Sequence, residues 1–171
     1  GASMSVHRPH TAIVLDCADG TRLLLDTSSG NSVLRQGAAL GMPAEGFEQV
    51  LLTHHHADHM GGLPFIQSYR TFIEPDGSPL RVYGTEEALA TVRRYCVATR
   101  PLAIRVDQEG ASTISGRQVI RWDPTEPGQR IGLGDTTWAS PFPADHISGA
   151  VGWRVESDGL AVVFSGDTRS N

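Results

Sequence analysis

The sequence predicts an α/β layered domain. Short apolar runs rich in Val, Ile and Leu, each long enough for one strand, are separated by turn residues along the 171-residue chain. Two other segments have apolar residues at helical spacing, and strands and helices alternate. No internal repeat, heptad or low-complexity tract indicates a repeat or fibrous architecture. The length suits one domain with its own hydrophobic core.

The N-terminal part predicts a β-hairpin. Thr11–Leu15 and Arg22–Leu25 are both apolar enough to form strands. Asp19 and Gly20 lie between them and supply the positive-φ turn that joins antiparallel strands. Residues 26–30 are polar and small, which is typical of a turn after the second strand.

A short helix and a further strand follow this turn. The helix is expected from about Ser32 to Leu40, with Asn31 as its N-cap and Gly41 as its C-terminal stop. Gln49–Thr53 is the next strand. Leu63–Ile66 is apolar enough for a short buried helix or a buried turn, and the pattern does not decide between them.

The next pair of elements is a strand followed by a helix. The strand is Leu80–Tyr83. The helix runs to about Cys96, with Thr85 as its N-cap and Glu86 and Glu87 near the positive end of its dipole. Apolar residues recur at helical spacing along it, so one face of the helix is expected to join the core.

The pattern is weak between residues 100 and 129, where loop compositions surround Val119–Trp122. We expect this segment to be an edge strand. The last hairpin is the clearest strand pair in the chain: it covers Val151–Phe164 and turns at Ser157–Gly159.

The composition limits the partners. A net charge of −5 with 6% aromatic residues offers no basic face for a polyanion, which disfavours nucleic acid without excluding it, since bound cations would add positive charge. Cys17 and Cys96 lie in no Cys-x-x-Cys pair and indicate thiols of a reducing compartment. The sequence shows no membrane span and no signal peptide, so a cytoplasmic protein is the default expectation.

A histidine cluster directly after the strand Gln49–Thr53 predicts a metal site. Alternate residues of an extended segment share a side, so His54 and His56 can bind one cation while His55 points away. Asp58 and His59, one step further round the turn, can then serve a second cation. Imidazole and carboxylate ligands without a nearby thiolate favour Zn²⁺, with Mn²⁺ or Fe as alternatives.

The His-x-His-x-Asp-His pattern, a strand ending in Thr before it and Gly-Gly after it, resembles the metallo-β-lactamase superfamily. Asp145-His146 resembles the third motif of that superfamily, and Ser165-Gly166-Asp167-Thr168 resembles the fourth, whose Asp bridges two metals. The resemblance runs from about Arg8 to Arg169. It implies an αββα metallo-β-lactamase-like β-sandwich flanked by helices.

The resemblance also implies a ligand set and a reaction. His54, His56 and His146 would hold the first metal, Asp58 and His59 the second, and Asp167 both. A hydroxide bridging two divalent cations would then be the nucleophile of a hydrolase. Asp58 would also have a catalytic role, because its free carboxylate oxygen can accept the proton of the attacking water or pass it to the leaving group.

Asp26 is a candidate acceptor for the N–H of a ligand histidine. The alternative, that it only caps its own turn through Thr27 and Ser28, is equally compatible with the sequence.

The substrate class is narrower than the superfamily. β-Lactamases of the two-zinc kind generally have Cys where this chain has Asp167, which disfavours antibiotic hydrolysis. Leu80–Gly84, Gly132–Asp135 and the residues after His146 resemble the branch of ribonuclease Z, cyclic phosphodiesterases and arylsulfatase-like enzymes. This branch implies a phosphodiester or related ester of small or modest size as substrate. A thioester or lactone is the alternative.

A final histidine is expected some tens of residues beyond Asp167, whereas this sequence ends at Asn171. We therefore expect residues 4–171 to be a single domain that lacks its C-terminal part. Residues 1–3, Gly-Ala-Ser before Met4, are expected to be the scar of a cleaved expression tag. A homo-oligomer or a C-terminal complementing segment would complete such a domain. An inactive metal-binding fragment that needs this segment is the alternative from another functional class.

Overall fold

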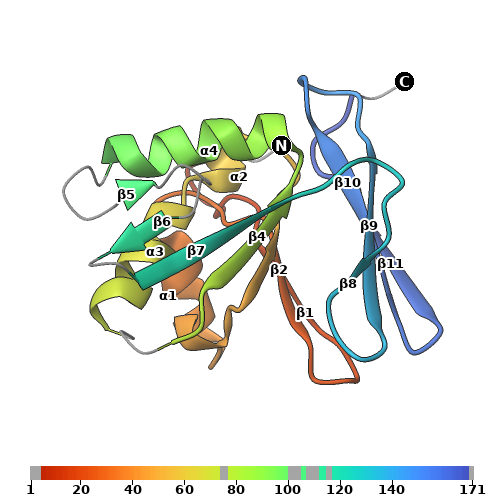
Figure 1. Ribbon diagram of the computed structural model, residues 1–171, viewed down its shortest axis with the longest axis horizontal. Coiled ribbons are helices and arrows are strands. Elements are labelled where there is room, and N and C mark those ends of the chain that lie inside the picture. The colour runs from red at the N-terminus through yellow and green to blue at the C-terminus, as the bar shows by residue number, and fades with distance from the viewer. Residues whose placement is uncertain (1–4, 74–76, 100–104, 107–111, 115–116, 170–171) are drawn as a thin grey trace.

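The computed structural model describes residues 5–73, 77–99, 105–106, 112–114 and 117–169. Two β-sheets pack face to face, and the described helices cover the outer face of the larger one (Figure 1). This arrangement supplies the αββ part of the predicted αββα sandwich and confirms the α/β fold class. Within the described ranges, no helix is long and apolar enough to cross a membrane.

The larger sheet has the strand order β1-β2-β3-β4-β7-β6-β5. Its central strands β2, β3, β4 and β7 are parallel, while β1 and β6 pair antiparallel at either side of them. The bounds are β1 Ile13–Asp16, β2 Arg22–Leu25, β3 Gln49–Leu51, β4 Leu80–Gly84, β5 Arg105–Val106, β6 Ser112–Ile114 and β7 Arg117–Pro124.

The prediction that Val119–Trp122 is an edge strand is wrong, because this segment lies inside β7, between β4 and β6. Ile120 is fully buried and Trp122 is 9% exposed. The edge of the sheet is instead formed by β5 and by β1.

The helices lie between or after the parallel strands. The predicted helix at residues 32–40 is confirmed as α1, and the predicted helix after Thr85 is confirmed as α4, three residues longer than expected. The segment predicted as a short helix or turn at Leu63–Ile66 is the start of the longer helix α3. The bounds are α1 Ser32–Ala39, η1 Ala44–Gly46, α2 Ala57–Met60, α3 Leu63–Phe72 and α4 Glu86–Thr99.

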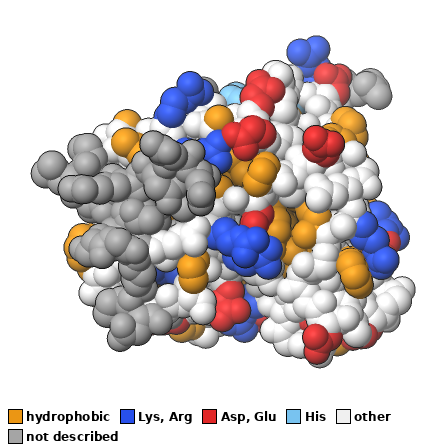
Figure 2. Space-filling model, in the orientation of Figure 1, with side chains coloured by type: hydrophobic (Ala, Val, Ile, Leu, Met, Phe, Trp, Pro, Cys, Tyr) orange, Lys and Arg blue, Asp and Glu red, His pale blue; other side chains and the backbone are white. Residues whose placement is uncertain are grey.

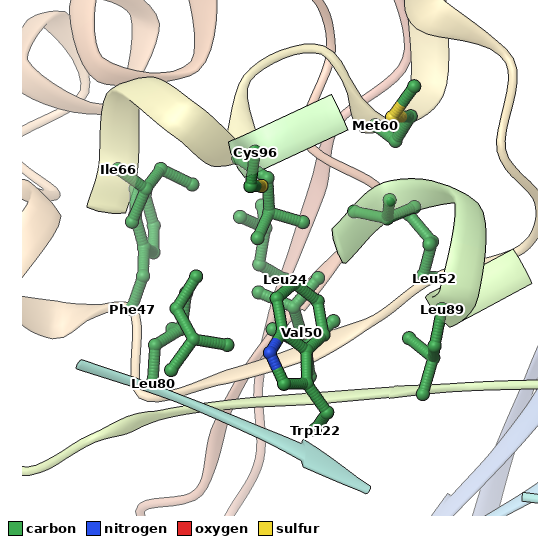
Figure 3. Packing of buried hydrophobic residues seen from close by; sticks show 14 of the residues in the cluster. Leu24, Phe47, Val50, Leu52, Met60, Ile66, Leu80, Leu89, Cys96 and Trp122 are labelled. Atoms are coloured by element: carbon green, nitrogen blue, oxygen red, sulfur yellow. The ribbon is translucent and has the colours of Figure 1, made fainter. Parts of the chain in front are cut away.

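The main hydrophobic core lies between these helices and the larger sheet (Figure 3). Leu24 and Val50 project from the central strands toward the helices, and Leu89 and Cys96 of α4 meet them. Val82 of β4 belongs to the same cluster. The side chains of Leu89 and Cys96 are fully buried. Helix α4 is therefore anchored along one face.

The smaller sheet has the strand order β11-β10-β9-β8 and is antiparallel throughout. The predicted last hairpin is confirmed by β10 and β11, whose turn has positive φ at Asp158 and Gly159. The bounds are β8 Ile131–Gly132, β9 Thr137–Pro143, β10 Val151–Ser157 and β11 Leu160–Phe164.

A second core cluster joins the two sheets. Leu23, Leu25 and Leu51 of the larger sheet meet Trp153 and Val155 of β10. The Trp153 indole Nε1 donates a hydrogen bond of 3.1 Å to the carbonyl oxygen of Leu52, just beyond the end of β3. This contact fixes β10 against the strand that leads into the histidine cluster.

Candidate metal centre

The histidine cluster begins at the carboxyl end of β3, where the chain leaves the sheet between the two core layers. Leu52, Thr53 and His54 are fully buried there. The backbone stays extended at His56, which precedes the single turn of α2. His59 lies inside this turn and is 1% exposed. The strand end and the turn thus direct several histidine rings toward one point.

Three imidazoles meet in the first group of side chains. His54 Nε2 lies 3.1 Å from His56 Nδ1, and His146 Nε2 lies 3.0 Å from the same nitrogen. The ring centroids are 4.7–4.8 Å apart, with each pair nearly perpendicular. His146 reaches the group from the connection between β9 and β10. Three ring nitrogens that point at one another are a typical donor set for a divalent transition metal.

A second group of possible ligand atoms adjoins the first. His54, His59 and Asp167 each place one such atom within 4.8 Å of the others. His59 Nε2 lies 3.4 Å from Asp167 Oδ1 and 3.7 Å from Asp58 Oδ2. Asp58 therefore lies beside this group without belonging to its tightest set.

Asp26 is linked to a histidine of each group, to His59 directly and to His54 through Thr53. Its Oδ1 accepts a 2.8 Å hydrogen bond from the Thr53 backbone N–H, and its Oδ2 accepts one of 2.8 Å from the Thr53 hydroxyl. His59 Nδ1 donates to the same Oδ2 over 2.6 Å. The carboxylate is fully buried, and these three donors offset the loss of hydration.

This network fixes which nitrogen of each ring carries the proton. Because His59 Nδ1 donates to Asp26, the lone pair of its neutral ring lies on Nε2, toward the carboxylates. The Thr53 hydroxyl gives its proton to Asp26, so it accepts a 2.9 Å hydrogen bond from His54 Nδ1. The lone pair of His54 therefore lies on Nε2 as well, facing the other imidazoles.

The protonation equilibria differ between the two rings. Burial lowers the pKa of His54 to about 3, and the nearby charges of His59, His56 and His146 act in the same direction. Burial alone would lower the pKa of His59, but the hydrogen bond and charge of Asp26 outweigh it, so this pKa is raised. Burial also raises the pKa of Asp26, against the opposing effects of His59 and Thr53. His54 is thus neutral at physiological pH.

Close backbone packing explains the Gly-Gly pair after the cluster. A Cβ atom on Gly61 would lie 2.3 Å from the carbonyl oxygen of Ala57, and one on Gly62 would lie 2.0 Å from that of Thr27. Gly62 N–H donates to the Ser28 carbonyl, and Thr27 N–H donates to the His59 carbonyl over 2.6 Å. The loop that carries Asp26 is thereby held directly against α2.

The structure brings His54, His56 and His146 together, and likewise His54, His59 and Asp167, with Asp58 beside them. His55 belongs to neither group, its ring centroid lies 6.3 Å from that of His56, and its buried Nδ1 has no hydrogen-bond partner among the described residues. The sequence left two roles open for Asp26, acceptor or turn cap, and the hydrogen bond from His59 supports the acceptor role. The relay through the Thr53 hydroxyl was not predicted, because a Thr at a strand end is only a weak signal.

The family profile described as "Beta-lactamase superfamily domain" matches residues 21–170. Ribonuclease Z of Mycobacterium bovis (strain BCG / Pasteur 1173P2) is 30% identical over 187 aligned positions, which cover 98% of this chain and 56% of that protein. Ribonuclease Z of Methanopyrus kandleri is 29% identical, with 92% of this chain and 47% of that protein covered. The chain thus spans about half the length of the curated relatives it matches.

Solved structures agree on the fold. The short form of human tRNase Z has a TM-score of 0.67 at 20% identity, covering 95% of this chain and 64% of that one. The metallo-beta-lactamase fold protein YhfI from Bacillus subtilis has a TM-score of 0.67 at 17% identity, covering 98% and 58%. At such identities the similarity establishes the shared architecture alone.

Proposed function

Because this chain belongs to the beta-lactamase superfamily, we propose that it is a metal-dependent hydrolase that cleaves phosphodiester bonds. One observation carries the proposal: His54 Nε2, His56 Nδ1 and His146 Nε2 converge, and the hydrogen bond to Thr53 leaves the His54 nitrogen free of a proton. A cluster of imidazoles arranged only for packing would have no need for such control of the tautomer.

The donor set fits two divalent cations, of which zinc is the first expectation. His54, His56 and His146 would hold one cation. His59 and Asp58 would hold the other, with Asp167 shared between the two. His54 belongs to both groups, but its one lone pair can serve only one cation, and its 3.1 Å contact to His56 supports a place in the first site.

Cations bound here would supply an activated water near neutral pH and would neutralise charge that develops on the substrate. The protein side chains have separate tasks. Asp26 keeps His59 oriented and, through Thr53, keeps His54 oriented. Asp58 lies 3.7 Å from His59 through one carboxylate oxygen, and its other oxygen can accept the proton released by the nucleophile or deliver it to the leaving group.

The name of the curated relatives favours a phosphodiester of RNA over a small ester. The net charge of −5 argues only against a broad electrostatic footprint. On the face drawn in Figure 2, the described basic and acidic side chains are interspersed. Recognition of the scissile phosphate would then depend on the bound cations rather than on a basic surface. Thioesters and lactones are the alternative substrates.

The test compares chromogenic phosphodiester, thioester and lactone substrates and a short RNA hairpin with a 3′ extension, each with zinc or manganese. His54→Ala and His56→Ala should lose bound metal and at least a hundredfold in activity, since each removes a ligand of the first cation. His55→Ala is the matched control and should retain both. Faster turnover of the thioester or the lactone than of both phosphodiesters would contradict the proposed substrate class, and unchanged metal content in His54→Ala would contradict the site itself.

A further inference from the structure

His146 is the one member of the first imidazole group that comes from a distant part of the chain. His54 and His56 belong to one short segment whose geometry follows from the end of β3. His146 lies ninety positions from His56 in sequence and is carried by the connection between β9 and β10. The distance between the two segments therefore depends on whatever holds this connection in place.

Besides backbone hydrogen bonds from Val151 to Thr53 and from Arg169 to Asp145, the start of α4 holds the connection. The Thr85 hydroxyl donates a 2.7 Å hydrogen bond to the carbonyl oxygen of Gly149. The Ser148 hydroxyl donates one of 2.7 Å to Glu87 Oε2. In Figure 1 the start of α4 and the β9–β10 connection lie at the same end of the molecule. Two consecutive residues of the loop are thus bound to Thr85, which directly precedes α4, and to Glu87 in the first turn of α4.

The packing at this contact is close. Gly149 has a φ of +74°, and a Cβ atom there would lie 3.0 Å from Thr85 Oγ1 and 3.1 Å from Glu87 Cβ. Helix α4 is itself fixed, because Ala88 and Leu89 in the same turn are fully buried in the main core. The loop therefore rests on a rigid part of the protein.

From these contacts we infer that Thr85 and Glu87 are positioning residues that set the place of His146 in the first metal site. The inference rests on the proposed function, because it assumes that His146 binds a cation. Neither residue is among the candidate ligands. Their effect would pass through the Gly149 carbonyl and the Ser148 hydroxyl to the backbone that carries His146.

The two contacts differ in a way that a test can use. Thr85 Oγ1 also accepts a 3.4 Å contact from the Ala88 N–H, so it caps α4 while its proton goes to Gly149. Thr85→Asp keeps a good N-cap but has no proton to donate to Gly149, whereas Thr85→Ser keeps both functions. Helix capping and loop positioning are thereby separated.

Glu87→Ala tests the second contact, with Glu86→Ala as its matched control. Both variants remove one carboxylate from the first turn of α4, but Glu86 is bound to Arg93 and not to the loop. Competition titrations with a chromogenic zinc chelator, run on the full chain, should show about tenfold weaker zinc binding at the first site for Glu87→Ala and for Thr85→Asp. Glu86→Ala and Thr85→Ser should stay within about twofold of the wild type.

The decisive measurement repeats the Glu87→Ala change in a His146→Ala background. Positioning of His146 predicts no further loss of zinc affinity there, because the residue being positioned is gone. An equal loss in both backgrounds would overturn the inference, as would wild-type affinity in Glu87→Ala while His146→Ala is impaired. If His146→Ala itself binds zinc normally, the assigned metal site fails instead.

Discussion

Replacing Asp26 by asparagine should reverse the tautomers of two histidines while leaving the fold in place. The amide oxygen must stay at the Oδ1 position, because the Thr53 backbone N–H points there. The amide NH₂ then occupies the Oδ2 position. In the wild type, the oxygen at this position accepts hydrogen bonds from the Thr53 hydroxyl and from His59 Nδ1. A donor at this point turns both partners into acceptors. His59 then carries its proton on Nε2, and the Thr53 hydroxyl donates to His54 Nδ1, so His54 also carries its proton on Nε2.

The expected cost is larger for metal binding than for folding. All the buried groups of Asp26→Asn retain partners, so exchange of charge-assisted for neutral hydrogen bonds should lower the free energy of unfolding by about 1–2 kcal/mol. To bind a cation, each ring must return to its other tautomer and leave a buried hydrogen without an acceptor. At His59 the amide N–H and the Nδ1–H then face each other, and at His54 the Thr53 hydroxyl hydrogen loses its acceptor. That costs roughly 1–3 kcal/mol per ring, or about 5- to 150-fold in affinity at each site.

Three measurements test this reasoning. Long-range ¹H–¹⁵N correlation spectra of the metal-free protein report the tautomers of His54 and His59, zinc titrations report both affinities, and urea unfolding reports stability. Asp16→Asn is the control, since it removes a carboxylate whose partner is Arg22 at the surface. Protonation of Nδ1 on both rings in Asp26→Asn, or wild-type affinity at both sites, would refute the argument.

Three further outcomes follow from the packing. Gly62→Ala should lower the free energy of unfolding in urea by roughly 1–3 kcal/mol, because its Cβ would lie 2.0 Å from the Thr27 carbonyl; a loss below about 0.5 kcal/mol would contradict this contact. Burial raises the pKa of Cys96 from 9.0 to about 12. Between pH 9 and pH 12, Cys96 is therefore a thiolate in the unfolded chain and a neutral thiol in the folded one. Stability should therefore fall by about 1.4 kcal/mol per pH unit above pH 9, and the part due to this thiol should vanish in Cys96→Ala. Val163 is 61% exposed on the edge strand β11. Val163→Lys should therefore reduce self-association measured by light scattering and leave the free energy of unfolding unchanged. Equal self-association of the variant and the wild type would show that this edge does not mediate it.

The sequence pattern predicted those elements whose environment follows from local alternation. The hairpin of β10 and β11 is an example, since its turn needs positive φ at Asp158 and Gly159. The full length of α3 was not apparent because Gln67 and Arg70 are buried, at 1% and 3% exposure, and interrupt the apolar spacing. The Arg70 guanidinium donates to the Phe47 carbonyl, an acceptor 23 residues away that no local pattern contains.

The position of β7 in its sheet also could not be predicted from local sequence patterns. The composition of Val119–Trp122 indicates a strand, but whether a strand is central or peripheral depends on which partners pair with it. Here β4 lies on one side and β6 on the other. The sequence between residues 100 and 129 has too few strong signals to predict the second pairing.

The candidate site divides in the same manner. The six predicted ligands come from motifs in which residue type and spacing are both informative. The residues that orient these ligands do not come from such motifs. Asp26 contacts Thr53 and His59 across 27 and 33 positions, and Thr85 contacts Gly149 across 64. Each of these is an ordinary turn or cap residue in isolation, and only the fold shows what it holds.

These supports act on two different properties of the ligands. Asp26 determines where the protons lie on His54 and His59, one ring of each proposed site. Thr85 and Glu87 act on the place of His146, which belongs to the first site only. Loss of Asp26 should therefore weaken the binding of both cations. Loss of either contact to the start of α4 should weaken cation binding at the first site only. Among variants that keep all six proposed ligands and the fold, weaker binding at both sites therefore indicates an effect on protonation, and weaker binding at the first site alone indicates an effect on position.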